Sequence, residues 1–517
     1  MNENKVQELQ DVVIRFSGDS GDGMQLTGTL FSDTSALLGN GISTFPDYPA
    51  EIRAPQGTVA GVSGFQVHFG AKRQLNPGDF CDVLIAMNPA ALKANRKWLK
   101  PGATVILDED SITEEHLRKA GFATLDPIRE LNLEDFNVVV PNITEMTKAA
   151  LADSGLDNKA MVKCKNMFAL GICFYLYNRP EDHAKRYLDS KFAKKNPAIA
   201  EANKRAIDAG YNYAANTHQF ANTYTVASGQ MEKGTYRSIS GNVATAWGLC
   251  AASEKSGLPL FCGSYPITPA TVILEELAKR KDLGVKTVQA EDEIAGICTA
   301  IGASFAGNFA VTTTSGPGLS LKSEALGLAV MTELPLVVVD VQRGGPSTGL
   351  PTKTEQSDLA QALYGRNGEC PVIVVAASSP SDCFHYAFEA GRLAMEHMTP
   401  VILLTDGFIA NGSEPWRIPE MKDYPAIQPP IVDKAPEGGF MPYVRNEKLA
   451  RGWAFPGKVG LEHRVGGLEK DCVKGCISHD PANHQKMTDT RAAKVAKVAE
   501  DIPAQAVWGL SLIHISE

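Results

Sequence analysis

Residues 258–280, LPLFCGSYPITPATVILEELAKR, combine an apolar run, a turn bracketed by two prolines and a helical pattern. The run 258–262 predicts a buried strand, and Pro269 suits the first position of the helix after the turn. Further strand-like runs lie at 285–289, 309–313, 336–341, 372–376 and 401–404, and helical patterns cover 244–255, 269–280, 294–306, 319–331, 359–362 and 380–396. This alternation predicts a doubly wound parallel sheet with helices on both faces.

The first half of the chain shows a similar α/β pattern. A strand at 12–16 is followed by the glycine-rich turn 17–28, SGDSGDGMQLTG, and by a helical pattern through Leu38. Further strand-like runs lie at 59–69, 83–86, 104–107 and 137–140, with helical patterns at 142–153 and 159–177 and polar helices over 181–209. These runs predict another mostly parallel sheet. Residues 211–238, rich in Asn, Thr, Ser and Tyr, predict a linker.

The composition is that of a globular protein in a reducing compartment. The chain has 517 residues, 44% hydrophobic and 21% charged, and its 50 basic and 59 acidic side chains give a net charge of −9, which argues against a nucleic-acid partner. Ten cysteines are scattered along it, several within apolar stretches. The N-terminus is polar, and acidic residues and a proline interrupt the longest apolar region, 325–341. We therefore expect no signal peptide, no membrane span and a cytoplasmic location.

Glu293 begins a helical pattern rich in alanine and glycine, and Gly302 follows it nine residues later. This spacing resembles the pyrimidine-binding helix of thiamine diphosphate enzymes, where a glutamate hydrogen-bonds N1′ of the aminopyrimidine. A desolvated carboxylate can favour the protonated ring nitrogen. The alternative is a solvated acidic residue that interacts with the helix dipole. Glu291 competes for the same role, and only the spacing to Gly302 selects Glu293.

Two further motifs are suited to binding a carboxylate. In 263–269, GSYPITP, two prolines restrict the backbone around Thr268, whose hydroxyl and the following helix amides could hold an anion. Alternatively, Thr268 only caps the helix. Arg343 follows the apolar strand 336–341, at the end of a parallel strand where ligands often bind. Its guanidinium could grip a carboxylate with two hydrogen bonds, or form a surface ion pair.

The segments 265–269, YPITP, and 341–358, VQRGGPSTGLPTKTEQSD, resemble hallmarks of the 2-oxoacid:ferredoxin oxidoreductases. The resemblance covers roughly residues 11–500 and is specific for the 2-oxoglutarate:ferredoxin oxidoreductase alpha subunit with a gamma domain fused at its N-terminus. It also rests on four other segments, GDSGDG (18–23), FPDYPAEIRAPQGT (45–58), VSGFQVHF (62–69) and ILLTDGFIANGSEPWRIP (402–419).

The resemblance implies the domain order. We expect a gamma-type domain at 1–210, the linker 211–238 and a pyrimidine-binding domain at 239–425. Residues 426–509 would be an irregular connection and the start of a truncated transketolase-C-terminal-like domain. The last eight residues, LSLIHISE (510–517), match the in-frame translation of a common sequencing adapter, and we expect them to be a scar.

The resemblance also implies the chemistry, the oxidative decarboxylation of 2-oxoglutarate to succinyl-CoA and CO2, with electrons passed to ferredoxin. Glu293 would bind thiamine diphosphate, helped by Pro266 and Ile267, while Thr268 and Arg343 would hold the oxoacid carboxylate. Further substrate contacts are expected from Tyr265, Ser347, Thr348 and Lys353. The Mg²⁺ and [4Fe-4S] sites would lie in a beta subunit, with coenzyme A as co-substrate. The alternatives are a pyruvate or branched-chain oxoacid substrate, or a non-catalytic binding subunit in a hetero-oligomer.

Two patterns resemble metal sites without their full ligand sets. Gly21-Asp22-Gly23 starts like the diphosphate and magnesium motif of thiamine enzymes, but no asparagine-containing partner segment follows. The loop with Gly18, Gly21 and Gly23 is instead expected to face an anion or coenzyme A, or to be a tight turn only. Cys472 and Cys476, with His479 and His484 nearby, fit neither ferredoxin nor zinc spacing. We therefore expect no metal ligands in this chain.

Overall fold

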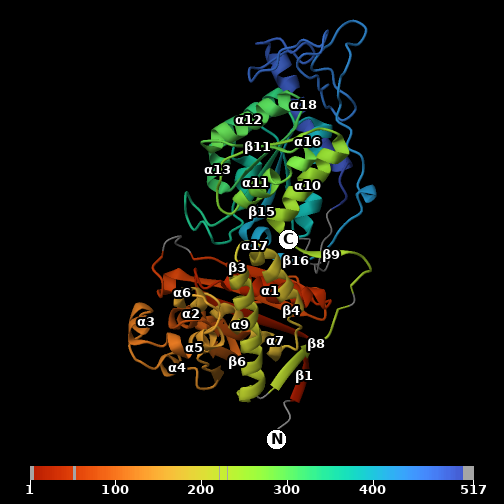
Figure 1. Cartoon of the computed structure of the whole chain (residues 1–517). Helices are drawn as coiled ribbons and strands as arrows, with labels where there is room; N and C mark the ends of the chain where they lie inside the picture. The colour runs from red at the N-terminus through yellow and green to blue at the C-terminus, as the bar shows by residue number, and fades with distance from the viewer. Residues whose placement is uncertain (1–4, 50–53, 221, 230, 505–517) are drawn as a thin grey trace, which may run out of the picture.

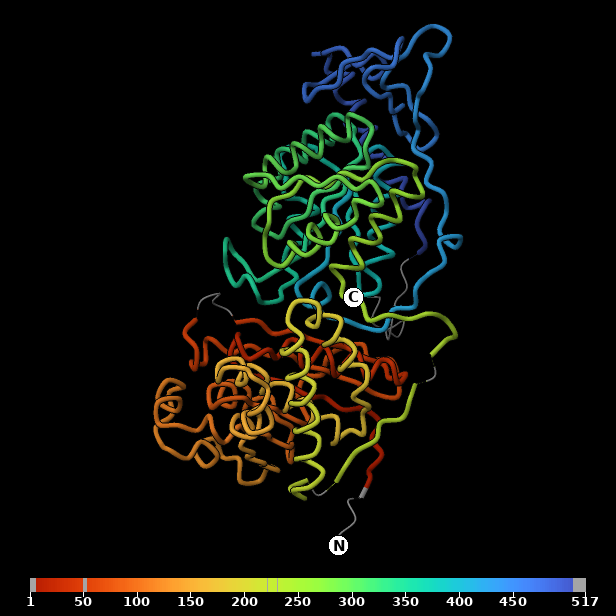
Figure 2. Tube along the Cα trace, viewed as in Figure 1, coloured from red at the N-terminus to blue at the C-terminus, as the bar shows by residue number. Residues whose placement is uncertain are grey.

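The computed structural model describes residues 5–49, 54–220, 222–229 and 231–504, which form two α/β domains stacked one above the other (Figure 1). Figure 2 shows that residues 426–480 run as a long irregular trace along and beyond the second domain. Within the described residues, no helix is long and apolar enough to cross a membrane. The predicted scar, 510–517, lies outside the described residues.

The first domain contains a mixed sheet in the order β3-β4-β2-β5-β6-β7. Its strands are β2 (Asp11–Asp19), β3 (Gly41–Asp47), β4 (Val62–Gly70), β5 (Cys81–Ala86), β6 (Leu99–Leu107) and β7 (Asn137–Val139). β2, β5, β6 and β7 are parallel, whereas β3 and β4 are antiparallel to their neighbours. β4 alone therefore runs against the other five strands, so the sheet is mostly parallel as predicted, whereas β3, whose sequence contains glycine and proline, escaped prediction.

Helices cover the first sheet. They are α1 (Met24–Leu37), α2 (Pro89–Asn95), α3 (Glu114–Lys119), α4 (Pro127–Glu130), α5 (Ile143–Ala150), α6 (Asn158–Val162), α7 (Lys165–Leu176), α8 (Asp182–Leu188) and α9 (Pro197–Thr217). Helices α7 and α9 pack with their backbones almost in contact. A Cβ on Gly210 would lie 1.9 Å from the Phe168 carbonyl oxygen, so only glycine allows this approach.

The second domain is the predicted doubly wound parallel sheet, in the order β11-β10-β12-β13-β15-β14. Its strands are β10 (Leu260–Ser264), β11 (Lys286–Gln289), β12 (Phe309–Thr314), β13 (Leu336–Gln342), β14 (Ile373–Ala376) and β15 (Pro400–Asp406). The chain order reverses between β10 and β12. In open α/β sheets, such a reversal leaves a crevice at the carboxyl ends of the strands.

The helices of this domain divide between the two faces of the sheet. Buried side chains of α10 (Gly241–Ser256), α11 (Thr271–Ala278) and α16 (Asp382–His397) share one apolar core. Those of α12 (Glu293–Phe305), α13 (Gly316–Leu321), α14 (Ser323–Thr332) and α15 (Leu359–Tyr364) form a smaller core on the other. The single helix predicted at 319–331 is therefore two helices, separated at Lys322. The short α17 (Gly407–Asn411) follows β15.

The segment 211–238 is more regular than a linker. Helix α9 continues to Thr217, and β8 (Asn222–Val226) pairs in parallel with β1 (Lys5–Leu9) beside the first domain. β9 (Tyr236–Ser240) pairs with β16 (Ser413–Arg417) at the second. Backbone pairing thus ties the crossing segment to both domains.

Residues beyond 425 are mostly irregular until α18 (Pro481–Lys497), yet buried charges fasten them to the second domain. Glu333 is buried and accepts hydrogen bonds of 2.6 Å from both Arg445 and Lys494. These two cations hold the pKa of Glu333 well below its usual range, while burial lowers the pKa of Lys494 to about 8. The start of a transketolase-C-terminal-like domain here stays a prediction.

Candidate functional site

A cavity of about 380 Å³ lies where the carboxyl ends of the second sheet meet the first domain. The second domain contributes Thr268, Pro269 and Val272 from the segment after β10, and Arg343 and Lys353 from the segment after β13. From the first domain, the cavity is lined by Ser20, Tyr48 and Pro49. The structure therefore brings together three of the predicted substrate-binding residues, Thr268, Arg343 and Lys353, at an interdomain position.

Arg343 is buried, with 7% of its surface exposed, and only neutral groups accept its hydrogen bonds. Its Nη1 donates to the Thr268 carbonyl at 2.7 Å and its Nη2 to the Thr348 carbonyl at 3.5 Å. Its Nε is buried with no partner among the described residues. Burial lowers the pKa of Arg343, and the negative charge of Glu293 opposes this shift. An uncompensated guanidinium with a free donor suits an anionic ligand.

Thr268 does not cap α11. The helix begins at Thr271, its cap residue is Ala270, and no side chain caps it. Pro269 likewise precedes the helix rather than occupying its first position. The backbone carbonyl of Thr268 instead orients Arg343, while its exposed hydroxyl lies at the cavity. The helix-cap alternative is therefore not observed.

Glu293 is the first residue of α12, and it is buried with 8% of its surface exposed. Asp292 is the helix cap, since its Oδ1 accepts a hydrogen bond from the Ala295 amide at 2.7 Å. Within the described residues, no group donates a hydrogen bond to the Glu293 carboxylate. Glu291 is exposed. Burial thus distinguishes the two candidates, and the role of Glu293 stays a prediction.

Close packing surrounds Glu293. A Cβ on Gly318 would lie 2.8 Å from Glu293 Cγ, and a Cβ on Gly296 would lie 3.2 Å from Ser264 Cα on β10. Lys322 is buried between α13 and α14, and its Nζ donates to the Glu293 carbonyl at 2.7 Å. Burial lowers the pKa of Lys322 to about 8. By contrast, Gly302 has open space where a Cβ would be, so this part of α12 is left uncovered.

Two buried residues near the site were not predicted from the sequence, Lys322 and Asp340. Asp340 lies on β13, buried close to Asp358 just before α15, and within the described residues neither of its carboxylate oxygens has a hydrogen-bond partner. Burial raises the pKa of both groups, and the charge of Asp358 raises that of Asp340 further. Both carboxyls therefore hold their protons to a higher pH than an exposed aspartate does. The signal for this pair was one acidic residue within an otherwise apolar strand, LVVVDVQ.

The glycine-rich loop is a well-ordered turn. Gly23 has a φ of 75° and precedes α1, so this position favours glycine. The carboxylate of Asp22 accepts a hydrogen bond from the Asp19 amide, and that of Asp19 accepts one from the Gly57 amide. Ser20, between Gly18 and Gly21, lines the cavity.

The remaining candidates lie around the cavity without lining it. Tyr265, Ser347 and Thr348 are exposed, and Ile267, after Pro266, packs against the apolar core of the domain. In the part of the chain that is described, no three His, Cys, Asp or Glu side chains are placed to hold a metal ion. His484 instead contacts Glu469 at 2.7 Å.

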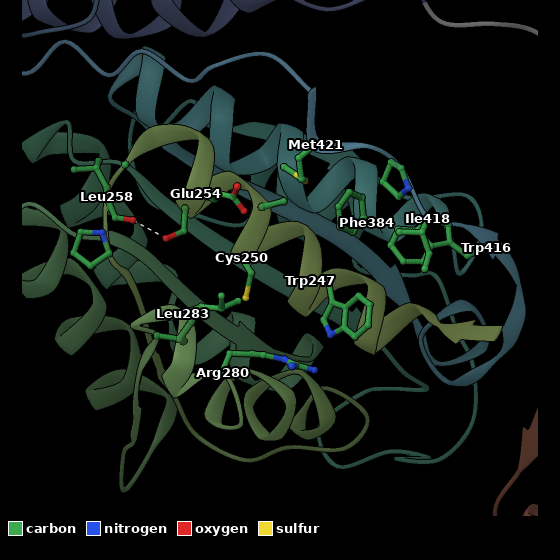
Figure 3. Close-up of a pocket in the computed structure, with 16 residues that line it drawn as sticks. Trp247, Cys250, Glu254, Leu258, Arg280, Leu283, Phe384, Trp416, Ile418 and Met421 are labelled. Atoms are coloured by element: carbon green, nitrogen blue, oxygen red, sulfur yellow. Dashed lines mark hydrogen bonds between the residues drawn. The ribbon is translucent and has the colours of Figure 1, made fainter. Parts of the chain in front are cut away.

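A larger cavity, of about 720 Å³, lies along α10 and contains none of the candidate residues (Figure 3). Aromatic and aliphatic side chains line it, among them Trp247, Phe384 and Trp416. Its arginine, Arg280, is already paired with Glu276 at 2.7 Å and lies over the Trp247 ring. The other charged residue that lines it, Glu254, is exposed.

Residues 254–477 match the family described as pyruvate flavodoxin/ferredoxin oxidoreductase, thiamine diP-bdg, and residues 13–213 match the family pyruvate ferredoxin/flavodoxin oxidoreductase. The chain is 54% identical over 490 residues to the 2-oxoglutarate oxidoreductase subunit KorA of Mycobacterium tuberculosis, covering 95% of this chain and 74% of that protein.

A 2-oxoacid:ferredoxin oxidoreductase alpha subunit of Aeropyrum pernix is 27% identical, over 96% of this chain and 79% of its own. The solved 2-oxoglutarate:ferredoxin oxidoreductase from Magnetococcus marinus, with 2-oxoglutarate, coenzyme A and succinyl-CoA bound, superposes with a TM-score of 0.82 at 33% identity. The match covers 97% of this chain and 82% of that one. The chain belongs to the 2-oxoacid:ferredoxin oxidoreductase family, in the 2-oxoglutarate alpha-subunit branch. The predicted resemblance, fold class and enzyme class are confirmed.

Proposed function

We propose that this chain supplies the oxoacid- and pyrimidine-binding half of a 2-oxoglutarate:ferredoxin oxidoreductase. The overall reaction converts 2-oxoglutarate and coenzyme A into succinyl-CoA, CO2 and a proton, and two electrons leave to ferredoxin. The observation that carries the proposal is Arg343, a buried guanidinium that has no carboxylate partner among the described residues and lies at a cavity between two domains. The 2-oxoglutarate relatives support the choice of substrate.

Arg343 and Thr268 would hold the carboxylate next to the keto group. A guanidinium stays charged at any physiological pH and can donate two parallel hydrogen bonds to a carboxylate. The contact of Nη1 with the Thr268 carbonyl fixes the orientation of the group in advance. Preorganised charge of this kind needs no rearrangement when the substrate arrives. Tyr265, Ser347 and Thr348 would complete the wall around the substrate.

The surroundings of Glu293 fit the aminopyrimidine ring of thiamine diphosphate. A buried carboxylate without a donor is costly, and a protonated ring nitrogen would supply that donor. Bound thiamine diphosphate supplies the nucleophilic carbon and the electron sink for decarboxylation. Glu293 would hold the proton at N1′, while Lys322 fixes the backbone of Glu293 through its carbonyl. Pro266 and Ile267, after β10, would contact the ring.

The first domain would bind coenzyme A. Ser20 places the loop of Gly18, Gly21 and Gly23 at the same cavity as Arg343. The thioester is formed on the carbon next to the lost carboxylate, so the thiol must reach this cavity. The solved relative from Magnetococcus marinus contains coenzyme A.

The family consists of multi-subunit oxidoreductases, and we propose that a beta subunit completes this site. It would carry the diphosphate, Mg²⁺ and [4Fe-4S] ligands and pass electrons to ferredoxin. The uncovered face of α12 at Ile294, Cys298 and Gly302 is available for that subunit. All ten cysteines are free thiols, which favours a reducing compartment such as the cytoplasm.

The proposal is tested with the complex of this chain and the subunits that co-purify with it. Wild type should decarboxylate 2-oxoglutarate with methyl viologen as acceptor, and should be at least tenfold less efficient, in kcat/KM, with pyruvate or branched-chain 2-oxoacids. Equal or better turnover of those substrates would contradict the proposed substrate. Turnover by this chain alone would contradict the shared site.

A further inference from the structure

We propose that Asp47, in the first domain, is a positioning residue for the Arg343 segment, and that it acts through an ion pair with Lys353. The proposal rests on the proposed function insofar as Arg343 binds the oxoacid. Asp47 is the last residue of β3, and its Oδ1 lies 2.7 Å from Lys353 Nζ in the second domain. Asp47 itself is not among the cavity-lining residues, whereas Lys353 is.

Asp47 is held in place within the first domain by a buried arginine, Arg15. Its Oδ2 accepts a hydrogen bond from Arg15 Nη2 at 2.6 Å. The other two nitrogens of the Arg15 guanidinium donate as well, Nε to Asn95 Oδ1 and Nη1 to Gln66 Oε1. One carboxylate thus bridges a cation of each domain, and its position is set by the first domain.

Lys353 ends a small hairpin, residues 344–353, that begins directly after Arg343. The Gly344 amide donates to the Lys353 carbonyl and the Leu350 amide donates to the Gly344 carbonyl, both at 2.9 Å. Thr348, whose carbonyl accepts from Arg343, lies at the tip of this hairpin. The Asp47–Lys353 pair therefore holds the far end of the segment that contacts the guanidinium.

A second contact reinforces the same junction. Thr352 Oγ1 donates to the Pro49 carbonyl at 2.9 Å, and Lys353 Nζ donates to the Tyr48 carbonyl at 2.9 Å. An ammonium has three donors, so Asp47 and Tyr48 leave one that can reach the cavity. Substituting Lys353 thus removes both the ion pair and a cavity-facing donor, whereas substituting Asp47 removes the charge that positions Lys353 and that also pairs with Arg15.

The test compares Asp47→Asn, Lys353→Met and the double variant in the complete enzyme complex. We expect Asp47→Asn to raise the KM for 2-oxoglutarate about 3- to 10-fold with little change in kcat, as suits a half-exposed charged contact. Hydrogen exchange of the hairpin amides 344–353 should become several-fold faster in both single variants. The double variant should resemble the more affected single variant, because both act through one pair.

Lys100→Met is the matched control, since the Lys100–Asp82 pair has similar exposure and lies in the first domain away from the cavity. It should leave hairpin exchange and KM unchanged. Unaltered hairpin exchange in Asp47→Asn and Lys353→Met would overturn the proposal, as would effects that add fully in the double variant. Hydrogen exchange of the hairpin is measured without turnover, so it tests whether the Asp47–Lys353 pair positions the hairpin even if the substrate is not 2-oxoglutarate.

Discussion

Two of the buried arginines, Arg15 and Arg343, differ in how their charge is satisfied. Arg15, in the first domain, donates to Asn95, Gln66 and the carboxylate of Asp47. Arg343, in the second, donates only to backbone carbonyls and retains a buried donor without a partner. Burial is the same for both, at 7% exposure. The difference between these two is that Arg15 has a carboxylate partner within its own domain, whereas Arg343 has none among the described residues and lies at the cavity.

The largest effect that this comparison predicts is loss of activity in Arg343→Met. Removing a charged hydrogen-bond donor from the oxoacid should lower kcat/KM about 100- to 1,000-fold, or about 3–4 kcal/mol of transition-state stabilisation. The thermal midpoint should change little, because no carboxylate is left unpaired. Steady-state kinetics with methyl viologen and a thermal melt provide the two measurements. A fully active Arg343→Met enzyme would show that Arg343 is not needed to bind the oxoacid, and would contradict the functional role assigned to it.

Glu293→Gln tests the other candidate residue, whose carboxylate accepts no hydrogen bond from the described residues. The amide cannot hold the ring-nitrogen proton as a carboxylate does, so kcat should fall about 100-fold or more. Assembly of the complex should persist, since the amide has the same shape, and gel filtration checks this. Near-normal decarboxylation of 2-oxoglutarate by this variant would refute the assignment of Glu293.

Arg15→Met should give the opposite pattern to Arg343→Met. The substitution leaves Asp47, Asn95 and Gln66 without their shared donor, which should lower the free energy of unfolding by about 2–3 kcal/mol. Denaturant unfolding followed by circular dichroism measures this loss. Any rise in KM should be small and no greater than that of Asp47→Asn. Unchanged stability would mean that the hydrogen bonds of Arg15 do not contribute to the free energy of unfolding, and would contradict its structural role.

The smallest effect concerns the carboxyl pair Asp340–Asp358, where no cation is present. Burial and the charge of Asp358 raise the pKa of Asp340 above its ordinary value of 3.8. The folded state then binds a proton that the unfolded state has released, so this contribution to stability is lost as pH rises through the raised folded-state pKa. Thermal melts between pH 5 and 9 should show a decline that Asp340→Asn flattens. An identical profile in Asp340→Asn would argue against a retained proton.

The sequence alone was sufficient for the parts of the fold that rest on local patterns. Strand-like runs located all six strands of the second sheet within a few residues; the signal is strongest for β12, β13 and β15, because parallel strands buried on both faces are largely apolar. Strand β3, GISTFPD, was missed because a polar edge strand with glycine and proline lacks that signal. The break between α13 and α14 was missed as well, since the buried contact of Lys322 with Glu293 is not local.

The candidate site shows the same limit. The spacing to Gly302 selected Glu293 over Glu291, and the position after a strand selected Arg343. The ion pair of Lys353 with Asp47 spans 306 residues, so no local pattern could indicate it. Sequence also could not tell that Arg343 lacks a carboxylate partner, because that depends on every element packed around it. Local chemistry identified the residues, and only the packed structure assigned their partners.

The buried ion pairs of Glu333 with Arg445 and Lys494 determine how far along the chain a separately produced second domain must extend. A protein cut near residue 425, where the regular elements of the sheet end, would lose Arg445 and Lys494 and leave the Glu333 carboxylate stranded in apolar surroundings. Such a fragment should aggregate or titrate abnormally. A boundary at about residue 500 retains both cations, so the apparently structureless tail is an integral component of domain stability.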